Sequence, residues 1–130
     1  MSGKYMAYVG SYSYTGKAKG ITVFDVDVKN GTFRERSEME VDNSSYVIAS
    51  SDGKTLYSIA DEGVVSFRIL QNGSLARLNS APIRGMRGCH LCTDMEDKYV
   101  FVSGYHDDKT TVVSLNKDGS VGLIVDEVFN

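Results

Sequence analysis

The chain has no tryptophan, a single proline and two cysteines among its 130 residues. It also has no apolar run of about 18 or more residues, the length that a transmembrane helix needs, so we expect no membrane partner. A formal net charge of −3 leaves no basic excess and excludes nucleic acid from the expected partners. The N-terminus lacks the apolar stretch of about 7–15 residues that signal peptides carry. Together these absences favour a cytoplasmic globular protein.

The two cysteines, Cys89 and Cys92, have the Cys-x-x-Cys spacing found in many metal and redox sites. Zinc usually takes four ligands, and the chain has no second cluster of cysteine and histidine. Residues three apart on a strand also point to opposite faces of the sheet. We therefore interpret both cysteines as buried, unpaired thiols. No metal and no cofactor are expected.

Three stretches repeat one pattern, in which Asn or Asp is followed by Gly, then Ser or Thr, then an apolar residue. Their glycines, Gly31, Gly73 and Gly119, are 42 and 46 residues apart. A second alignment, with an offset of 44, places residues 45–57 over residues 89–101. Repeats in the forties, built from short apolar runs and Asn-Gly or Asp-Gly turns, are typical of β-propeller blades.

Strand-like runs separated by turn residues predict an all-β chain. The eleven expected strands are residues 5–11, 20–28, 32–41, 46–50, 55–60, 64–70, 75–81, 90–93, 99–104, 110–115 and 121–129. The repeat groups them into blades of four antiparallel strands: blade one (about 4–42) without its inner strand, blade two (about 43–84) and blade three (about 85–130). Because closure normally takes about 4–8 blades, we expect a partial propeller. Remaining blades, or other copies of the chain, would close the ring.

Five short motifs follow one another along the chain: Tyr-Val-Gly-Ser-Tyr at 8–12, Gly-Ile-Thr-Val-Phe-Asp at 20–25, Ser-Asp-Gly-Lys-Thr-Leu-Tyr at 51–57, Gly-Val-Val-Ser-Phe-Arg at 63–68 and Gly-Cys-His-Leu at 88–91. In their order and spacing they resemble the lactonase family of seven-bladed propellers, which includes bacterial 6-phosphogluconolactonases. The Trp-Asp type of propeller fits less well, because the chain has no tryptophan. Residues 104–108, Gly-Tyr-His-Asp-Asp, depart from the family's Asn-Tyr-Gly-Gly-Gly. The resemblance implies the N-terminal portion of a seven-bladed propeller.

The resemblance further implies a cofactor-free hydrolase of a sugar lactone, such as 6-phosphogluconolactone of the pentose phosphate pathway. The family's later segment, rich in His and containing Arg, lies beyond residue 130, so the chain by itself is expected to be inactive. Two alternatives stay open. One is a non-catalytic propeller that binds a partner or acts as a scaffold, since a fold does not fix a function. The other is a three-blade unit that oligomerises into a ring.

Lactone hydrolysis needs an activated water and donors for the developing oxyanion. His90 is the first catalytic candidate, because it begins an inner strand and an imidazole exchanges protons near neutral pH. The alternative is a structural histidine. Glu62 is a second candidate base, although an ordinary turn carboxylate fits the same position. Tyr46 is equivalent to His90 in the preceding blade and is a candidate for substrate binding.

Two arginines, Arg84 and Arg87, lie in the glycine-containing segment that leads to His90. They could bind the phosphate or carboxylate of a sugar acid, or be solvated surface residues. Tyr12 and Tyr105 follow the second strand of their blades at roughly equivalent positions. We expect both at the same end of the propeller as Glu62, where they could contact substrate.

Overall fold

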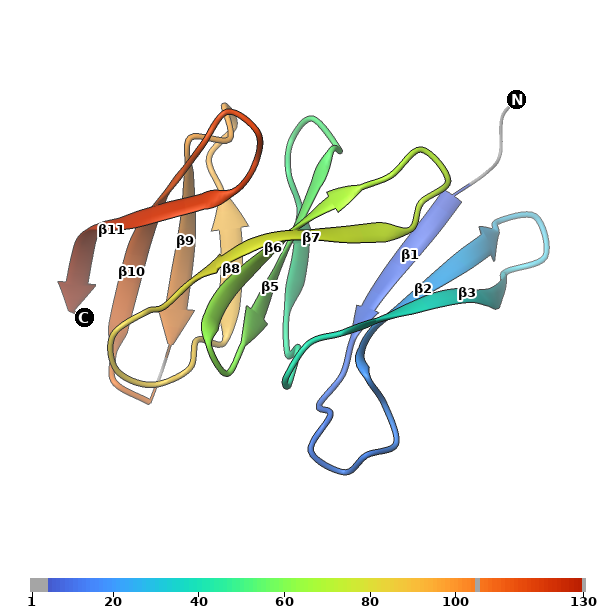
Figure 1. The fold of residues 1–130 in the computed structure, drawn as a ribbon, viewed down its shortest axis with the longest axis horizontal. Helices are drawn as coiled ribbons and strands as arrows, with labels where there is room; N and C mark the ends of the chain where they lie inside the picture. Colours follow the sequence, from blue (N-terminus) through green and yellow to red (C-terminus); the bar gives the residue numbers. More distant parts are fainter. Residues whose placement is uncertain (1–4, 105, 130) are drawn as a thin grey trace.

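The computed structural model describes residues 5–104 and 106–129, which form eleven strands in three antiparallel sheets (Figure 1). The first sheet contains β1 (Tyr5–Gly10), β2 (Gly20–Asp27) and β3 (Thr32–Glu40). The second contains β4 (Val47–Ala49), β5 (Thr55–Ala60), β6 (Gly63–Ile69) and β7 (Leu75–Ala81). The third contains β8 (His90–Thr93), β9 (Tyr99–Gly104), β10 (Lys109–Leu115) and β11 (Val121–Phe129). The all-β prediction is confirmed, and every expected strand end lies within one residue of the observed one.

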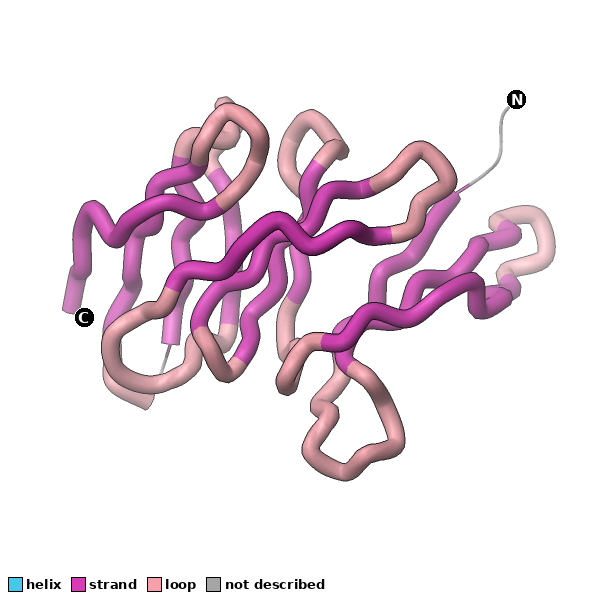
Figure 2. Tube along the Cα trace, in the orientation of Figure 1, coloured by secondary structure: helices cyan, strands magenta, loops and turns pink. Residues whose placement is uncertain are grey.

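Strands and turns alternate along the described chain, with no helix between them (Figure 2). The three repeated glycines occupy the turns that join the outer two strands of each sheet. Gly31, Gly73 and Gly119 have φ angles of +68°, +87° and +89°. Side chains other than glycine rarely adopt this left-handed region, because their Cβ atom meets the backbone. The repeated Asn-Gly and Asp-Gly pairs therefore specify hairpins through their backbone conformation.

The strand register repeats with the sequence. In the β4–β5 pair Val47 faces Ser58, and in the β8–β9 pair Leu91 faces Val102. The residues of the second pair have numbers 44 higher than those of the first, which is the offset that relates the two sequence segments. The second and third sheets are thus built on one template, residue for residue, along their inner strands.

Two apolar layers join the three sheets, and β5 lies between them. Leu56 and Ala60 pack toward the first sheet, whereas Tyr57 and Ile59 pack toward the third. Side chains on a strand alternate between its two faces, so one strand can contribute to both layers. All six residues of β5 are buried as a result.

The equivalent strands of the outer sheets are less covered. Tyr5 and Val9 on β1 and Tyr99 on β9 are exposed. In a closed propeller such faces pack against further blades. Within the described residues there is no helix of the length and apolarity needed to cross a membrane.

Candidate functional site

The strands of the three sheets run between two ends of the molecule (Figure 1). The hairpin end, toward the top of Figure 1, carries the turns 28–31, 50–54, 70–74, 94–98 and 116–120. The loop end, at the bottom, carries the segments 11–19, 41–46, 61–62, 82–89 and 106–108. Six of the seven predicted site residues belong to the loop end. The seventh, Tyr105, lies outside the described residues.

A pocket of about 330 Å³ opens at the loop end. It draws on loops of all three sheets and is lined by Tyr12, Ser45, Met86, Arg87, Gly88, Cys89 and His106. Tyr12 and Arg87 are two of the predicted substrate-binding residues. The structure therefore brings together side chains that lie 75 positions apart in the sequence.

Arg87 is held from two sides. Its Nη1 donates a hydrogen bond to Oδ1 of Asp61 over 2.7 Å. Its guanidinium carbon lies 5.1 Å from the centroid of the Tyr12 ring, a cation–π arrangement. A planar guanidinium with several donors matches phosphate and carboxylate groups. The pocket thus carries an oriented cation.

His90 begins β8, Tyr46 directly precedes β4, and the two side chains are in contact. Their ring centroids are 4.8 Å apart with planes inclined at 56°. Each directly follows a residue that lines the pocket, Cys89 before His90 and Ser45 before Tyr46. The imidazole is exposed. His90 therefore directly follows a pocket residue, and its catalytic role stays a prediction.

Glu62 is engaged elsewhere. Its Oε2 accepts hydrogen bonds from Arg77 Nη2 over 3.2 Å and from Ser80 Oγ over 2.9 Å, both on β7. These partners belong to the outer strand of its own sheet, and Glu62 does not line the loop-end pocket. The structure does not bring Glu62 and Arg87 to one site, and a catalytic role for Glu62 stays a prediction.

Arg84 is also separated from the pocket. Its Nη1 pairs with Glu127 Oε1 over 2.7 Å. Lys109, whose side chain is nearly buried, pairs with the other oxygen of Glu127 over 3.0 Å and donates to the carbonyl of Arg84. Hydrogen bonding from Lys109 is the main reason that the pKa of Glu127 lies below its usual range. This cluster ties the segment 82–88 to β11, and a substrate-binding role for Arg84 stays a prediction.

Sequence reasoning missed Ser45 as a pocket residue. Its Oγ is buried and has no hydrogen-bond partner among the described residues. Buried polar atoms are nearly always paired, so this hydroxyl is unusual. The offset of 44 that equates Ser45 with Cys89 is the signal that could have found it, because both residues line the same pocket.

The cysteines are free, as expected, but Cys89 and Cys92 are partly exposed, so the expectation of full burial is wrong. Cys89 precedes β8 and faces the pocket instead of entering the apolar layer between the sheets. In the described part of the chain, no cluster of three or more His, Cys, Asp or Glu could hold a metal ion.

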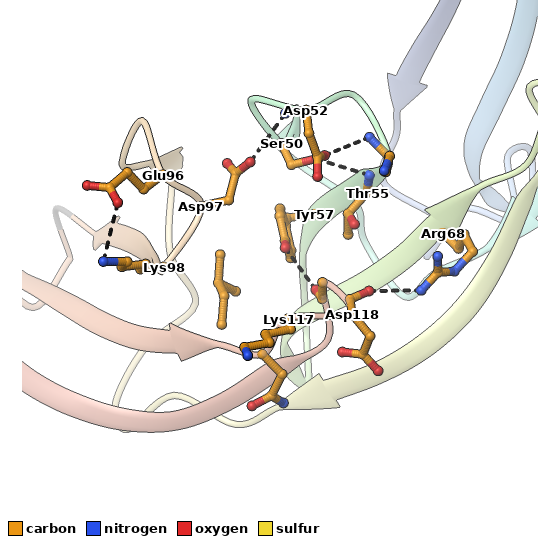
Figure 3. A pocket seen from close by; sticks show the side chains of 14 residues that line it. Ser50, Asp52, Thr55, Tyr57, Arg68, Glu96, Asp97, Lys98, Lys117 and Asp118 are labelled. Carbon is orange, nitrogen blue, oxygen red and sulfur yellow. Dashed lines mark hydrogen bonds and ion pairs between the residues drawn. The ribbon is translucent and has the colours of Figure 1, made fainter.

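A larger pocket, of about 450 Å³, lies at the hairpin end between the second and third sheets (Figure 3). The Asp52 and Asp97 carboxylates in it accept hydrogen bonds from turn residues. Asp52 accepts hydrogen bonds from Ser50 Oγ over 2.6 Å and from the backbone N–H of Lys54 over 2.9 Å. Asp97 accepts the backbone N–H groups of Ser51 and Asp52 across the sheet boundary. Since these acids already stabilise backbone groups, we assign this pocket a structural role despite its size.

At the hairpin end, two hydrogen bonds from tyrosine hydroxyls each link one sheet to its neighbour. Tyr57 donates to the carbonyl of Gly119 over 2.8 Å (Figure 3), and Tyr8 donates to the carbonyl of Gly73 over 2.7 Å. Burial, with a smaller contribution from the charge of Asp97, raises the pKa of Tyr57 to about 12. The phenol is thus a structural donor that stays protonated, and it has no role as a proton acceptor.

Comparison with known proteins identifies the family. A model described as "Lactonase, 7-bladed beta-propeller" matches residues 6–130. A 6-phosphogluconolactonase of Bacillus subtilis (strain 168) is 32% identical over 130 residues, which cover 95% of this chain and 37% of the relative. A 6-phosphogluconolactonase of Formosa agariphila is 31% identical, with 94% and 36% covered.

A solved structure agrees. The crystal structure of a candidate 6-phosphogluconolactonase from Bacteroides fragilis matches with a TM-score of 0.90 and 30% identity, covering 99% of this chain and 37% of that one. The chain thus spans little more than a third of the length of the relatives it matches. The resemblance seen in the sequence motifs is confirmed: this chain belongs to the lactonase family of seven-bladed β-propellers.

Proposed function

We propose that the protein hydrolyses a sugar lactone, with 6-phosphogluconolactone as the first candidate substrate. The observation that carries the proposal is the loop-end pocket, which is lined by the oriented cation of Arg87 and by Cys89, the residue directly before the exposed His90. The curated relatives of B. subtilis and F. agariphila, both 6-phosphogluconolactonases, support the same chemistry.

In the proposed reaction His90 accepts a proton from a water molecule while the water oxygen attacks the lactone carbonyl. The tetrahedral intermediate collapses, the bond between the carbonyl carbon and the ring oxygen breaks, and the ring oxygen takes up the proton. The product is the open hydroxy acid. Arg87 binds the anionic group of the substrate and fixes the carbonyl near His90. Ring opening by water needs no cofactor.

The active unit in this proposal contains more blades than the three sheets described. The chain spans 37% of the B. subtilis relative, and its outer sheets expose Tyr5, Val9 and Tyr99. Further blades, or other copies of the chain, would cover these faces and complete the site, so we expect the isolated chain to be inactive. We also propose a cytoplasmic location, which the proposed phosphorylated substrate of the pentose phosphate pathway supports.

The test is hydrolysis of 6-phosphogluconolactone by the protein as its source cell makes it, with spontaneous ring opening subtracted. We expect acceleration, and a loss of about 100-fold in kcat for His90→Ala, the usual size for removal of a general base. Because His90 is exposed, the thermal unfolding midpoint should stay within about 2 °C of wild type. Full activity in a folded His90→Ala variant would remove His90 from the mechanism.

A second candidate function is a propeller that binds a partner without catalysis. The polar His-Asp-Asp at residues 106–108, where the family has glycines, favours it. The same assay separates the two functions, because a folded wild-type protein that does not accelerate lactone opening would support the binding role.

A further inference from the structure

Arg87 stands at the end of a chain of contacts that joins loops of all three sheets. Asp61, in the turn between β5 and β6, accepts a hydrogen bond from Arg87 with Oδ1. The other carboxylate oxygen, Oδ2, accepts a hydrogen bond from Nδ2 of Asn43 over 2.8 Å. One carboxylate thus connects the loop before β8 with the loop before β4.

Asn43 continues the connection to the first sheet. Its Oδ1 accepts the backbone N–H groups of Ser13 over 2.8 Å and of Tyr14 over 3.2 Å, and its own N–H donates to Ser13 Oγ over 3.0 Å. Its φ of +58° lies in the left-handed region, where asparagine is tolerated better than most residues. Asn43 therefore binds the loop that follows β1 and carries Tyr12.

The contacts made by Asp61 and by Asn43 both lead to Arg87 at the pocket. The Tyr12 ring lies against the guanidinium of Arg87, and Tyr12 directly precedes the residues that Asn43 holds. Arg87 is therefore fixed by Asp61 along one edge and by Tyr12 on one face. A flexible arginine loses side-chain entropy when it binds an anion, and a side chain already held in place loses less. The contacts thus prepare Arg87 to bind a ligand.

We propose that Asp61 and Asn43 are positioning residues that orient Arg87 as the binding site for the phosphate group of a phosphorylated lactone. The inference rests on the proposed function and adds to it the substrate group that Arg87 binds and the residues that orient Arg87. Neither residue lines the pocket, so they act through Arg87 and Tyr12. Arg84, which is held by Glu127, takes no part.

A purely stabilising role is the competing explanation, and exposure argues against it. The side chains of Arg87 and Asp61 are 34% and 51% exposed. Ion pairs in such surroundings contribute little to folding. Asp25 and Arg36 form a comparable pair, at 3.0 Å and with exposures of 33% and 37%, on β2 and β3. Asp25→Ala is thus a matched control for Asp61→Ala outside the pocket.

The experiment compares Asp61→Ala, Asn43→Gly, Arg87→Ala and Asp25→Ala in the complete protein. Asn43→Gly is chosen because glycine accepts a positive φ while losing the side-chain contacts. KM and kcat are measured for 6-phosphogluconolactone and for gluconolactone, which lacks the phosphate. Binding of inorganic phosphate is followed independently by the ³¹P line width, which requires no catalysis.

We expect Asp61→Ala and Asn43→Gly to raise KM for the phosphorylated lactone by about tenfold, as when a charged hydrogen bond is loosened. Arg87→Ala should raise it further, and the increases should be much smaller for gluconolactone, whereas the Asp25→Ala control should stay near wild type for both lactones. An unchanged KM, or a lower one as expected if Asp61 merely neutralises Arg87, would overturn the inference and leave the lactonase function standing. Phosphate binding that weakens in the same order without any lactone hydrolysis would overturn the proposed function and leave the phosphate site standing.

Discussion

The two ends of the propeller use the same strands and differ in what their polar groups do. At the hairpin end, Asp52 and Asp97 accept backbone N–H groups, and Tyr57 donates to a backbone carbonyl. At the loop end, Ser45 has a buried hydroxyl without a partner among the described residues, and Arg87 faces a pocket. These hairpin-end groups stabilise turns and sheet contacts, whereas Ser45 and Arg87 at the loop end line a pocket, which supports the ligand site that we propose there.

Pocket volume alone would have pointed to the hairpin end as the ligand site. The hairpin-end pocket is larger, at about 450 Å³ against 330 Å³. Binding of a ligand there would have to compete with hydrogen bonds that already cap turns, and breaking such bonds leaves backbone groups unpaired. The partners of the lining residues, rather than the pocket volume, are therefore the reason that we propose the loop end as the functional end.

The largest effect on stability is expected for Gly119→Ala at the hairpin end. An added Cβ would lie 2.2 Å from Thr55 Oγ1 and 3.1 Å from Thr55 Cβ, at a φ of +89°. Backbone strain and overpacking together should cost about 3 kcal/mol. Gly31→Ala at the equivalent turn, with nothing within 4 Å, should cost about 1 kcal/mol. Urea unfolding of both variants measures the difference, and equal losses would show that contact with the neighbouring sheet is unimportant.

A smaller effect is expected for Tyr57→Phe, which removes the hydrogen bond to Gly119. The loss should be about 1 kcal/mol near pH 7. Burial raises the pKa of Tyr57 from 10.0 to about 12, so the unfolded chain ionises first. The stability due to the neutral phenol is complete below about pH 10 and is lost as the pH rises toward 12.

The measurement for Tyr57 is unfolding free energy against pH between 8 and 12. Wild type should lose stability more steeply than Tyr57→Phe over the upper part of this range. Parallel curves would mean that the phenol ionises equally easily in the folded and unfolded states.

The smallest effect on stability is expected at the loop end, for Ser45→Ala. Removing a hydroxyl that has no partner should change the unfolding free energy by less than about 0.5 kcal/mol. The adjacent Ser44→Ala deletes a buried 2.7 Å hydrogen bond between Ser44 and Ser58 and should cost about 1 kcal/mol. Thermal unfolding compares the two variants.

If Ser45 serves a ligand, Ser45→Ala should still weaken lactone binding, seen as a KM raised several-fold. A destabilisation equal to that of Ser44→Ala would show that Ser45 has a structural partner and would weaken the contrast between the two ends.

Local pattern was sufficient for the strands and their order. Every strand boundary lies within one residue of its expected position, and Gly31, Gly73 and Gly119 adopt the positive φ that their turns require. Short-range rules apply here, because alternation and turn chemistry act over a few residues. The repeat also placed His90 and Tyr46 at equivalent positions, and their rings are in contact.

The partners of the charged residues could not be predicted in the same way. Arg84 and Arg87 lie in one loop and look alike in sequence, yet one pairs with Glu127 and the other with Asp61 beside the pocket. Glu62, proposed as a base, is bound to Arg77. Such pairings join residues far apart in the chain, and the sequence contains no periodic signal for them.

The sequence by itself determined the blade repeat, the eleven strands, the hairpin glycines and the family, because each depends on patterns within about 45 residues. Only the tertiary structure decided which end has a pocket suited to a ligand. That decision depends on how Asn43, Asp61 and Arg87, from loops before and after different strands, meet in space. Their meeting follows from the packing of the second sheet between the first and the third, which no single blade sequence encodes.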